Sequence, residues 1–120
     1  MSRVAIVTGG TRGIGEAISI MLHEKGYKVA ANYGGNDERA RDFSNRTGIS
    51  AYKWDVSDFD ACMEGVAKVK AELGPIEIVV NNAGITRDGT LHRMDPENWQ
   101  KVIDTNLGSC FNMCRVTIED

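Results

Sequence analysis

A glycine-rich segment near the N-terminus has the composition of a phosphate-binding turn. It reads Thr8-Gly9-Gly10-Thr11-Arg12-Gly13-Ile14-Gly15 and lies between an apolar run, residues 4–8, and a helical pattern. Glycine allows the positive φ angles of a sharp turn and lets backbone amides come close to a ligand. The helix that follows would direct its unpaired N–H groups and its positive dipole end at the same point. These features predict a site for the pyrophosphate of a dinucleotide, and an ordinary strand-to-helix turn is the alternative.

The spacing of the glycines separates this segment from two other phosphate-binding motifs. Gly9, Gly13 and Gly15 follow the pattern Gly-x-x-x-Gly-x-Gly, which differs from the more common G-x-G-x-x-G form. The segment also lacks the Gly-Lys-Ser/Thr ending of a nucleotide-hydrolase P-loop. We therefore expect dinucleotide binding, and we do not expect phosphoryl transfer.

A second polar turn follows another apolar run further along the chain. Asn81-Asn82-Ala83-Gly84 comes directly after residues 76–80. In a doubly wound parallel sheet, ligands bind outside the carboxyl ends of the strands, at the point where the strand order reverses. If the strand order is 3-2-1-4, the first and fourth strands flank that crevice. We therefore expect the glycine-rich segment and this turn to face each other across one site.

The elements that must position these turns alternate regularly along the chain. Strand-like apolar runs cover residues 4–8, 27–33, 49–54 and 76–80. Helical patterns cover about residues 13–25, 37–46 and 57–73, and a fourth begins with Asp95 as N-cap and Pro96 at the first helical position. Ser57 is the expected N-cap of the third helix. This βαβαβαβα order predicts an α/β fold. We expect an incomplete Rossmann-type doubly wound parallel sheet of about four βα units, with the strand order 3-2-1-4.

Composition excludes several other classes of protein. The chain of 120 residues has 14 Lys and Arg against 17 Asp and Glu, so its net charge of -3 offers no basic surface for nucleic acid or anionic membranes. No apolar stretch approaches the roughly 18 residues of a membrane-spanning helix. The N-terminus shows no signal region, so we expect a cytoplasmic protein. Cys110 and Cys114, one helical turn apart, are too few for a zinc site, and we interpret them as buried free thiols; no metal is expected.

Three of these features together resemble a known family. Thr8 to Gly15 is similar to the TGxxxGIG signature of the short-chain dehydrogenase/reductases, and Asn81 to Gly84 is similar to their NNAG motif. Asn106 stands at the place of the family's helix asparagine, and the resemblance covers the whole chain. More narrowly, residues 81–88 and 104–107 resemble the acetoacetyl-CoA reductases of polyhydroxyalkanoate synthesis. The 3-oxoacyl-carrier-protein reductases share much of this pattern.

The resemblance implies an oxidoreductase activity and a set of partners. It implies NADPH-dependent reduction of a 3-oxoacyl thioester, acetoacetyl-CoA to 3-hydroxybutyryl-CoA, in polyhydroxybutyrate biosynthesis, or the same reaction on a carrier protein. It also implies a homotetramer. Asn106 would act catalytically in a water-mediated proton relay, and Asp88 would lie near the mouth where the thioester enters. Counting from Val102 to Cys110 and Met113 places Asn106 on an apolar helical stripe, where a satisfied core asparagine is the alternative.

The region after the second strand favours NADPH over NADH. An NAD-preferring site carries an acid near this strand end to bind the ribose hydroxyls, but residues 32–36 contain none. Arg12 and Arg39 could instead meet a 2′-phosphate with charge-assisted bonds, and solvated surface charges are the alternative reading. With the resemblance included, the predicted cofactor-binding residues are Gly9, Arg12, Gly13, Ile14, Gly15, Gly34, Arg39, Asp55, Val56, Asn82, Ala83, Gly84, Ile85 and Thr86. In that set, Asp55 and Val56 would line the adenine pocket.

One part of the family's chemistry is missing from these 120 residues. A carbonyl reductase needs a general acid, which the family takes from a Tyr-x-x-x-Lys motif supported by a serine. The residues four positions after Tyr27, Tyr33 and Tyr52 are Ala31, Asp37 and Val56, and none of them is lysine. We therefore expect residues 1–120 to be the N-terminal dinucleotide-binding portion of a single-domain enzyme whose C-terminal half is absent. Alone, this chain should be inactive and should bind NADPH weakly, and a non-catalytic nucleotide-binding module is the alternative.

Overall fold

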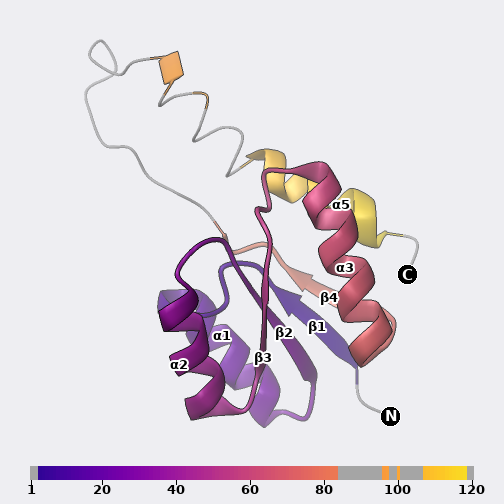
Figure 1. The fold of residues 1–120 in the computed structure, drawn as a ribbon. Helices are drawn as coiled ribbons and strands as arrows, with labels where there is room; N and C mark the ends of the chain where they lie inside the picture. The colour runs from indigo at the N-terminus through magenta and orange to yellow at the C-terminus, as the bar shows by residue number, and fades with distance from the viewer. Residues whose placement is uncertain (1–2, 84–95, 98–99, 101–106, 119–120) are drawn as a thin grey trace.

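A four-stranded parallel sheet forms the centre of the molecule (Figure 1). The computed structural model describes residues 3–83, 96–97, 100 and 107–118. The strands are β1 (Val4–Val7), β2 (Lys28–Tyr33), β3 (Ser50–Lys53) and β4 (Ile76–Val80). Their order is β3-β2-β1-β4, with every neighbouring pair parallel. The predicted fold class and strand order are therefore confirmed.

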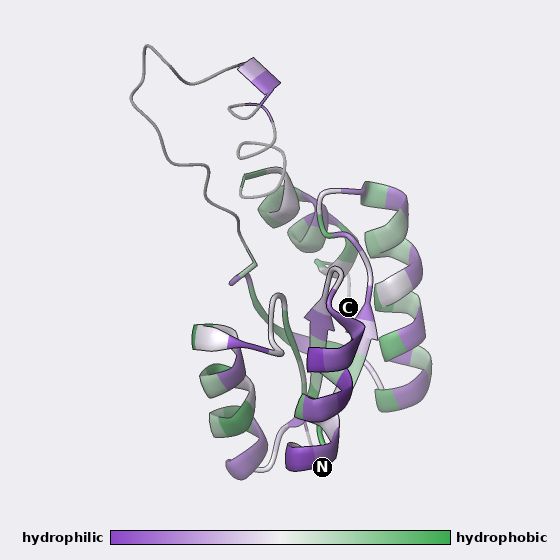
Figure 2. Ribbon diagram, turned by 60° about the vertical axis from the view of Figure 1, so that its left-hand side comes forward, coloured by the Kyte–Doolittle hydropathy of each residue, from purple (hydrophilic) through white to green (hydrophobic). Residues whose placement is uncertain are grey.

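Helices cover both faces of the sheet. The elements are α1 (Gly13–Glu24), α2 (Asp37–Thr47), α3 (Phe59–Leu73) and α5 (Ser109–Thr117). On one face α1 and α2 pack against the strands, and on the other α3 and α5 lie side by side (Figure 1). Most residues of α2 are hydrophilic, as the purple colour of its ribbon shows (Figure 2).

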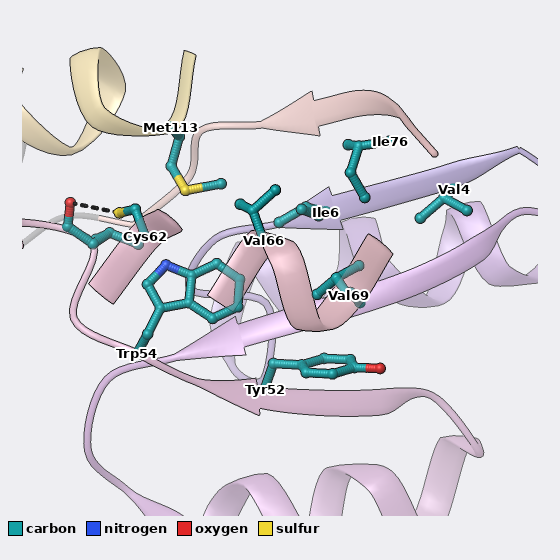
Figure 3. Packing of buried hydrophobic residues seen from close by; sticks show 11 residues of the cluster. Val4, Ile6, Tyr52, Trp54, Cys62, Val66, Val69, Ile76 and Met113 are labelled. Atoms are coloured by element: carbon teal, nitrogen blue, oxygen red, sulfur yellow. Dashed lines mark hydrogen bonds between the residues drawn. The ribbon is translucent and has the colours of Figure 1, made fainter. Parts of the chain in front are cut away.

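Alternating residues of the central strands belong to two separate hydrophobic cores, one on each face of the sheet. Val4 and Ile6 face the α3 and α5 side, and Val7 faces the α1 and α2 side. Because β1 lies between β2 and β4 and is covered on both faces, all four of its residues are buried. This double burial explains the unbroken apolar run that marked the strand in the sequence. Figure 3 shows the larger core, where Trp54 and Met113 pack near Val66.

The start of α3 differs from the prediction. Asp58, and not Ser57, is the N-cap, and its side chain accepts a hydrogen bond from the Ala61 amide at 3.1 Å. The amide and hydroxyl of Ser57 instead donate to Oδ1 of Asp55, at 2.9 and 2.7 Å. The prediction that Ser57 caps the helix was wrong because this local turn occupies its hydroxyl, and the helix begins two residues later. Pro96 and Glu97 are helical, and the predicted N-cap Asp95 lies outside the described residues.

The cysteines also depart in part from expectation. Cys62 is buried, Cys110 is half-buried and Cys114 is exposed, and all three are free thiols. Cys114 is not buried because Met113, one position earlier on α5, takes the place that faces the core. Among the described residues, no group of three or more His, Cys, Asp or Glu side chains is placed to hold a metal ion. None of the described helices combines the length and the apolar character needed to cross a membrane.

Candidate dinucleotide-binding site

A large cleft opens at the carboxyl ends of the strands. Its volume is about 1290 Å³. The residues that line it are Gly9, Thr11, Arg12, Gly13, Ile14, Asn32, Tyr33, Gly34, Gly35, Asn36, Arg39, Trp54, Asp55, Val56, Ser57, Asn82, Ala83, Glu97 and Gln100. We refer to this set as the strand-end cleft. Its position is where a doubly wound sheet binds ligands.

The glycine-rich loop needs its glycines for backbone geometry. Gly9 has a φ of 62°, in the left-handed region that side chains disfavour. Gly15 is buried at the start of α1, where an added Cβ would overlap the carbonyl oxygen of Gly9 and the side-chain amide of Asn82. The loop can therefore fold back tightly on its own helix only without a side chain at residue 15.

Thr8 joins the two predicted motifs directly. Its hydroxyl oxygen accepts hydrogen bonds from the amides of Asn82 and Ala83, both at 3.0 Å, and donates to the Val80 carbonyl at 3.3 Å. The side chain of Asn82 donates to the Gly9 carbonyl at 3.2 Å. The glycine-rich loop and the Asn82-Ala83 turn are thus held side by side at the ends of β1 and β4. The prediction that they meet at one site is confirmed.

Asn32 connects three strand ends, and the sequence reasoning did not single it out. Its side chain is 2% exposed at the end of β2. Oδ1 accepts from the Gly9 amide at 3.3 Å, and Nδ2 donates to the Trp54 carbonyl at 3.0 Å. The available signal was an amide in an otherwise apolar strand, because a buried amide must find hydrogen-bond partners.

The end of β2 carries no acid that faces the cleft. Asp37 lies outside it, where its carboxylate accepts from the Tyr33 hydroxyl at 3.0 Å and from Nζ of Lys53 at 3.3 Å. These two hydrogen bonds lower the pKa of Asp37. Arg12 and Arg39 line the cleft and form no ion pair with another described residue. Two guanidinium groups in the cleft wall are therefore available to an anionic ligand.

The N-terminus of α1 is open toward an anion. Its N-cap residue, Arg12, makes no side-chain capping hydrogen bond. In α2, by contrast, Asn36 caps the helix by accepting from the Arg39 amide at 3.0 Å. The first amides of α1 therefore point their N–H groups and the helix dipole into the strand-end cleft without a side chain that satisfies them.

Comparison with known proteins identifies the family. The sequence model described as "short chain dehydrogenase" matches residues 3–120. The chain belongs to the short-chain dehydrogenase family. The resemblance of the chain to this family is thereby confirmed.

Close relatives carry two related names. The chain is 63% identical over 113 residues to proteins named acetoacetyl-CoA reductase from Shinella zoogloeoides and from Rhizobium meliloti, with 94% of this chain and 47% of each relative covered. It is 48% identical over 124 residues to a 3-oxoacyl-(acyl-carrier-protein) reductase from Chlamydia muridarum, with 98% and 50% covered. The chain thus spans about half the length of the curated relatives it matches.

The structure places most of the predicted cofactor residues of this family member around one cavity. Those that line the strand-end cleft are Gly9, Arg12, Gly13, Ile14, Gly34, Arg39, Asp55, Val56, Asn82 and Ala83. Gly15 lies behind the loop and does not line it. Outside the described residues lie Gly84, Ile85, Thr86, Asp88 and Asn106. Glu97 and Gln100 also line the cleft, and no motif in the sequence pointed to them.

Proposed function

We propose that the strand-end cleft binds NADPH, and that residues 1–120 form the dinucleotide-binding portion of a single-domain reductase of 3-oxoacyl thioesters. The observation that carries the proposal is the Thr8 junction, which fixes the glycine-rich loop and the Asn82-Ala83 turn at the head of one cleft. The relatives named acetoacetyl-CoA reductase support acetoacetyl-CoA as the substrate and 3-hydroxybutyryl-CoA as the product. That assignment also supports a place in polyhydroxybutyrate biosynthesis.

Residues of the strand-end cleft could bind each part of the proposed cofactor. The open amides of α1 would bind the pyrophosphate, and Arg12 with Arg39 would bind the 2′-phosphate beside Gly34. Asp55 and Val56 would line the adenine pocket. The nicotinamide side would run along Asn82 and Ala83, and then along Gly84, Ile85 and Thr86. When bound, NADPH supplies the hydride for carbonyl reduction.

The remaining groups would handle the substrate and its proton. Asp88 would lie where the thioester enters, and Asn106 would hold a water of the proton relay. A carbonyl oxygen that receives a hydride also needs a proton donor. Because residues 1–120 contain no Tyr-x-x-x-Lys pair, we propose that this chain alone does not turn over.

Two other functions are alternatives to reduction of a CoA thioester. Reduction of a 3-oxoacyl group on a carrier protein is supported by the 48% identical relative from Chlamydia muridarum, but the 63% identical relatives favour the CoA thioester. A non-catalytic nucleotide-binding module would use the same cleft. Only the reductases predict a shift in the thermal midpoint with acyl thioester after NADPH has bound.

The surface of α5 supports self-association. Phe111 on α5, and Leu107 and Ile118 on either side of it, are 65%, 66% and 75% exposed, and their helical spacing places them on one side. An exposed apolar stripe of this kind marks an association surface. We propose a homotetramer that uses this stripe. Three free thiols in the described residues support a reducing compartment, the cytoplasm.

The test of cofactor choice is a titration of the purified chain with NADPH and with NADH. We expect NADPH to bind more tightly, in the micromolar to millimolar range. Arg39→Ala should weaken NADPH binding about tenfold, the factor for about 1.4 kcal/mol, and NADH binding less than twofold. Arg41→Ala is the matched control, since Arg41 is exposed on the same helix and does not line the cleft. Equal losses for both cofactors in Arg39→Ala would contradict the assignment of Arg39 to the 2′-phosphate.

A further inference from the structure

The carbonyl of Val56 is a meeting point of two helices and the cleft wall. Val56 follows β3, lines the strand-end cleft and is 6% exposed. Its carbonyl oxygen accepts a hydrogen bond from Nδ2 of Asn112, on α5, at 3.0 Å. It also accepts one from Sγ of Cys62, on α3, at 3.4 Å, drawn as a dashed line in Figure 3. One peptide group behind the cleft is thus tied to both helices on that face of the sheet.

Among the described residues, the Asn112 side chain makes no hydrogen bond other than the one to the Val56 carbonyl. The side chain is 8% exposed, beside the core residue Met113. Burying an amide costs free energy unless it is hydrogen-bonded. Because a carbonyl oxygen can only accept, the nitrogen of the amide must face Val56. A core-filling residue at this position would be apolar, so the asparagine is explained by the carbonyl that it meets.

Cys62 makes the weaker of the two contacts. Burial raises its pKa to about 11, so the group is a neutral thiol near pH 7. A thiol is a weak donor, whereas an amide N–H at 3.0 Å forms an ordinary strong hydrogen bond. Asn112 is therefore the group that chiefly fixes this peptide.

The peptide that Asn112 holds adjoins a side chain suited to base recognition. Asp55 precedes Val56, and its Oδ1 already accepts from the amide and hydroxyl of Ser57. Within the described residues, Oδ2 accepts no hydrogen bond and remains available in the cleft wall. A carboxylate oxygen accepts from the exocyclic amino group of adenine and cannot do so from the C6 oxygen of hypoxanthine. Recognition of the amino group requires that the backbone at residues 55–56 be held in place.

We propose that Asn112 is a positioning residue that holds the Asp55–Val56 segment so that the cleft discriminates adenine from other purines. This proposal rests on the proposed binding of NADPH. Asn112 touches no cofactor itself: it acts through the Val56 carbonyl, from a helix on the far side of the cleft wall.

The test compares NADPH with its analogue that carries hypoxanthine in place of adenine. Both ligands have the same pyrophosphate, 2′-phosphate and nicotinamide, so only the base differs. The unchanged chain should bind NADPH about tenfold more tightly, the factor for about 1.4 kcal/mol, as expected for one charge-assisted hydrogen bond. Asn112→Leu should reduce that preference to less than about twofold, with most of the loss on NADPH. Asn112→Ser, whose shorter side chain cannot reach Val56, should act in the same way and serves if the leucine variant does not fold.

A matched control separates positioning from simple destabilisation. Met113→Ala removes the buried neighbour of Asn112 and leaves the hydrogen bond to Val56 in place. It should lower the thermal midpoint as much as Asn112→Leu while keeping the preference for adenine. An adenine preference retained in both Asn112 variants would overturn the proposal. Equal binding of both ligands by the unchanged chain would also overturn it but leave the NADPH site intact, whereas no binding of either ligand would refute the proposed function itself.

Discussion

The carboxyl edge of the sheet and the outer surface of α2 use polar side chains in opposite ways. At the carboxyl edge, Thr8 and Asn32 are 1% and 2% exposed, and their hydrogen bonds all go to main-chain groups of other segments. On α2, Arg46 pairs with Glu16 and Asp42, each at 2.8 Å, with half of its side chain exposed. The first set is uncharged and shapes a cleft. The second is charged and covers a solvated face.

Burial decides how much each set contributes. A buried backbone group that loses its partner cannot turn to water, so the loss costs about 1–3 kcal/mol. An exposed ion pair exchanges its partner for water and salt, and many such pairs contribute nothing measurable to stability. The uncharged residues should therefore dominate both stability and function in this chain. Four substitutions test that ordering, from the largest expected effect to the smallest.

Gly15→Ala should have the largest effect. The added methyl group would overlap the carbonyl oxygen of Gly9, a backbone atom that cannot rotate away. We expect a loss of about 3 kcal/mol in the free energy of unfolding, measured by urea denaturation, and loss of NADPH binding. For stability, Gly35→Ala is the control, because no atom beyond its two chain neighbours lies within 4 Å of its Cβ position and its φ is not positive. If both variants unfold at the same urea concentration, the loop does not depend on this close approach.

Asn32→Ala should come next. It leaves the Gly9 amide and the Trp54 carbonyl without their partner at the point where three strand ends meet. We expect a loss of about 2 kcal/mol in the free energy of unfolding. NADPH binding should weaken as well, since Gly9 and Trp54 both line the cleft. Asn45→Ala, on the exposed face of α2, should change the free energy of unfolding by less than about 0.5 kcal/mol. Similar losses for the two asparagines would remove the contrast between the regions.

Local sequence was sufficient for the four strands, for the first three helices and for the two turns of the site. Glycine spacing from Gly9 to Gly15, and an Asn-Asn-Ala-Gly turn after an apolar run, are short-range patterns set by backbone geometry, and the structure puts both turns at one cleft. The strand order was taken over from the doubly wound Rossmann-type fold that the alternation of elements indicated, and the structure has the same order.

The residues that hold the binding loops in place could not be predicted from local sequence in the same way. Asn112 and its partner Val56 are separated by 56 positions, and no local pattern marks such a pair. The choice between Ser57 and Asp58 as N-cap failed for a related reason. Both residues can cap a helix, and the decision depends on the competing hydrogen bonds between Ser57 and Asp55. Sequence patterns therefore locate a binding loop more readily than the residues that hold it.

Tyr52 lies between the two extremes and gives a test by pH. Its ring is 6% exposed, and its hydroxyl donates to Oε1 of Glu72 at 2.6 Å. Burial, and then the Glu72 carboxylate, raise the pKa of Tyr52 from 10.0 to about 12. Between these values the unfolded chain releases the proton and the folded chain keeps it. The resulting stability is complete below about pH 10 and is lost as the pH rises through about 12.

Tyr52→Phe isolates this contribution. The variant should be about 1 kcal/mol less stable at pH 7, because it loses one hydrogen bond to a charged group. Above pH 10 its stability should fall less steeply than that of the unchanged chain. Tyr27→Phe is the control, since no hydrogen bond of its hydroxyl is seen within the described residues. Parallel stability curves for Tyr52→Phe and the unchanged chain between pH 10 and 12 would contradict the raised pKa.

Arg46→Met should have the smallest effect, although it removes two ion pairs, one with Glu16 on α1 and one with Asp42 within α2. Methionine keeps the length of the side chain and a high helix propensity, so the change isolates the charge. Since solvent reaches the guanidinium and both carboxylates, water and salt can replace the lost partners. The urea midpoint should be unchanged within error, both at low salt and at 0.5 M NaCl. A drop as large as that of Asn32→Ala would mean that the surface of α2 matters as much to the fold as the buried amides at the strand ends.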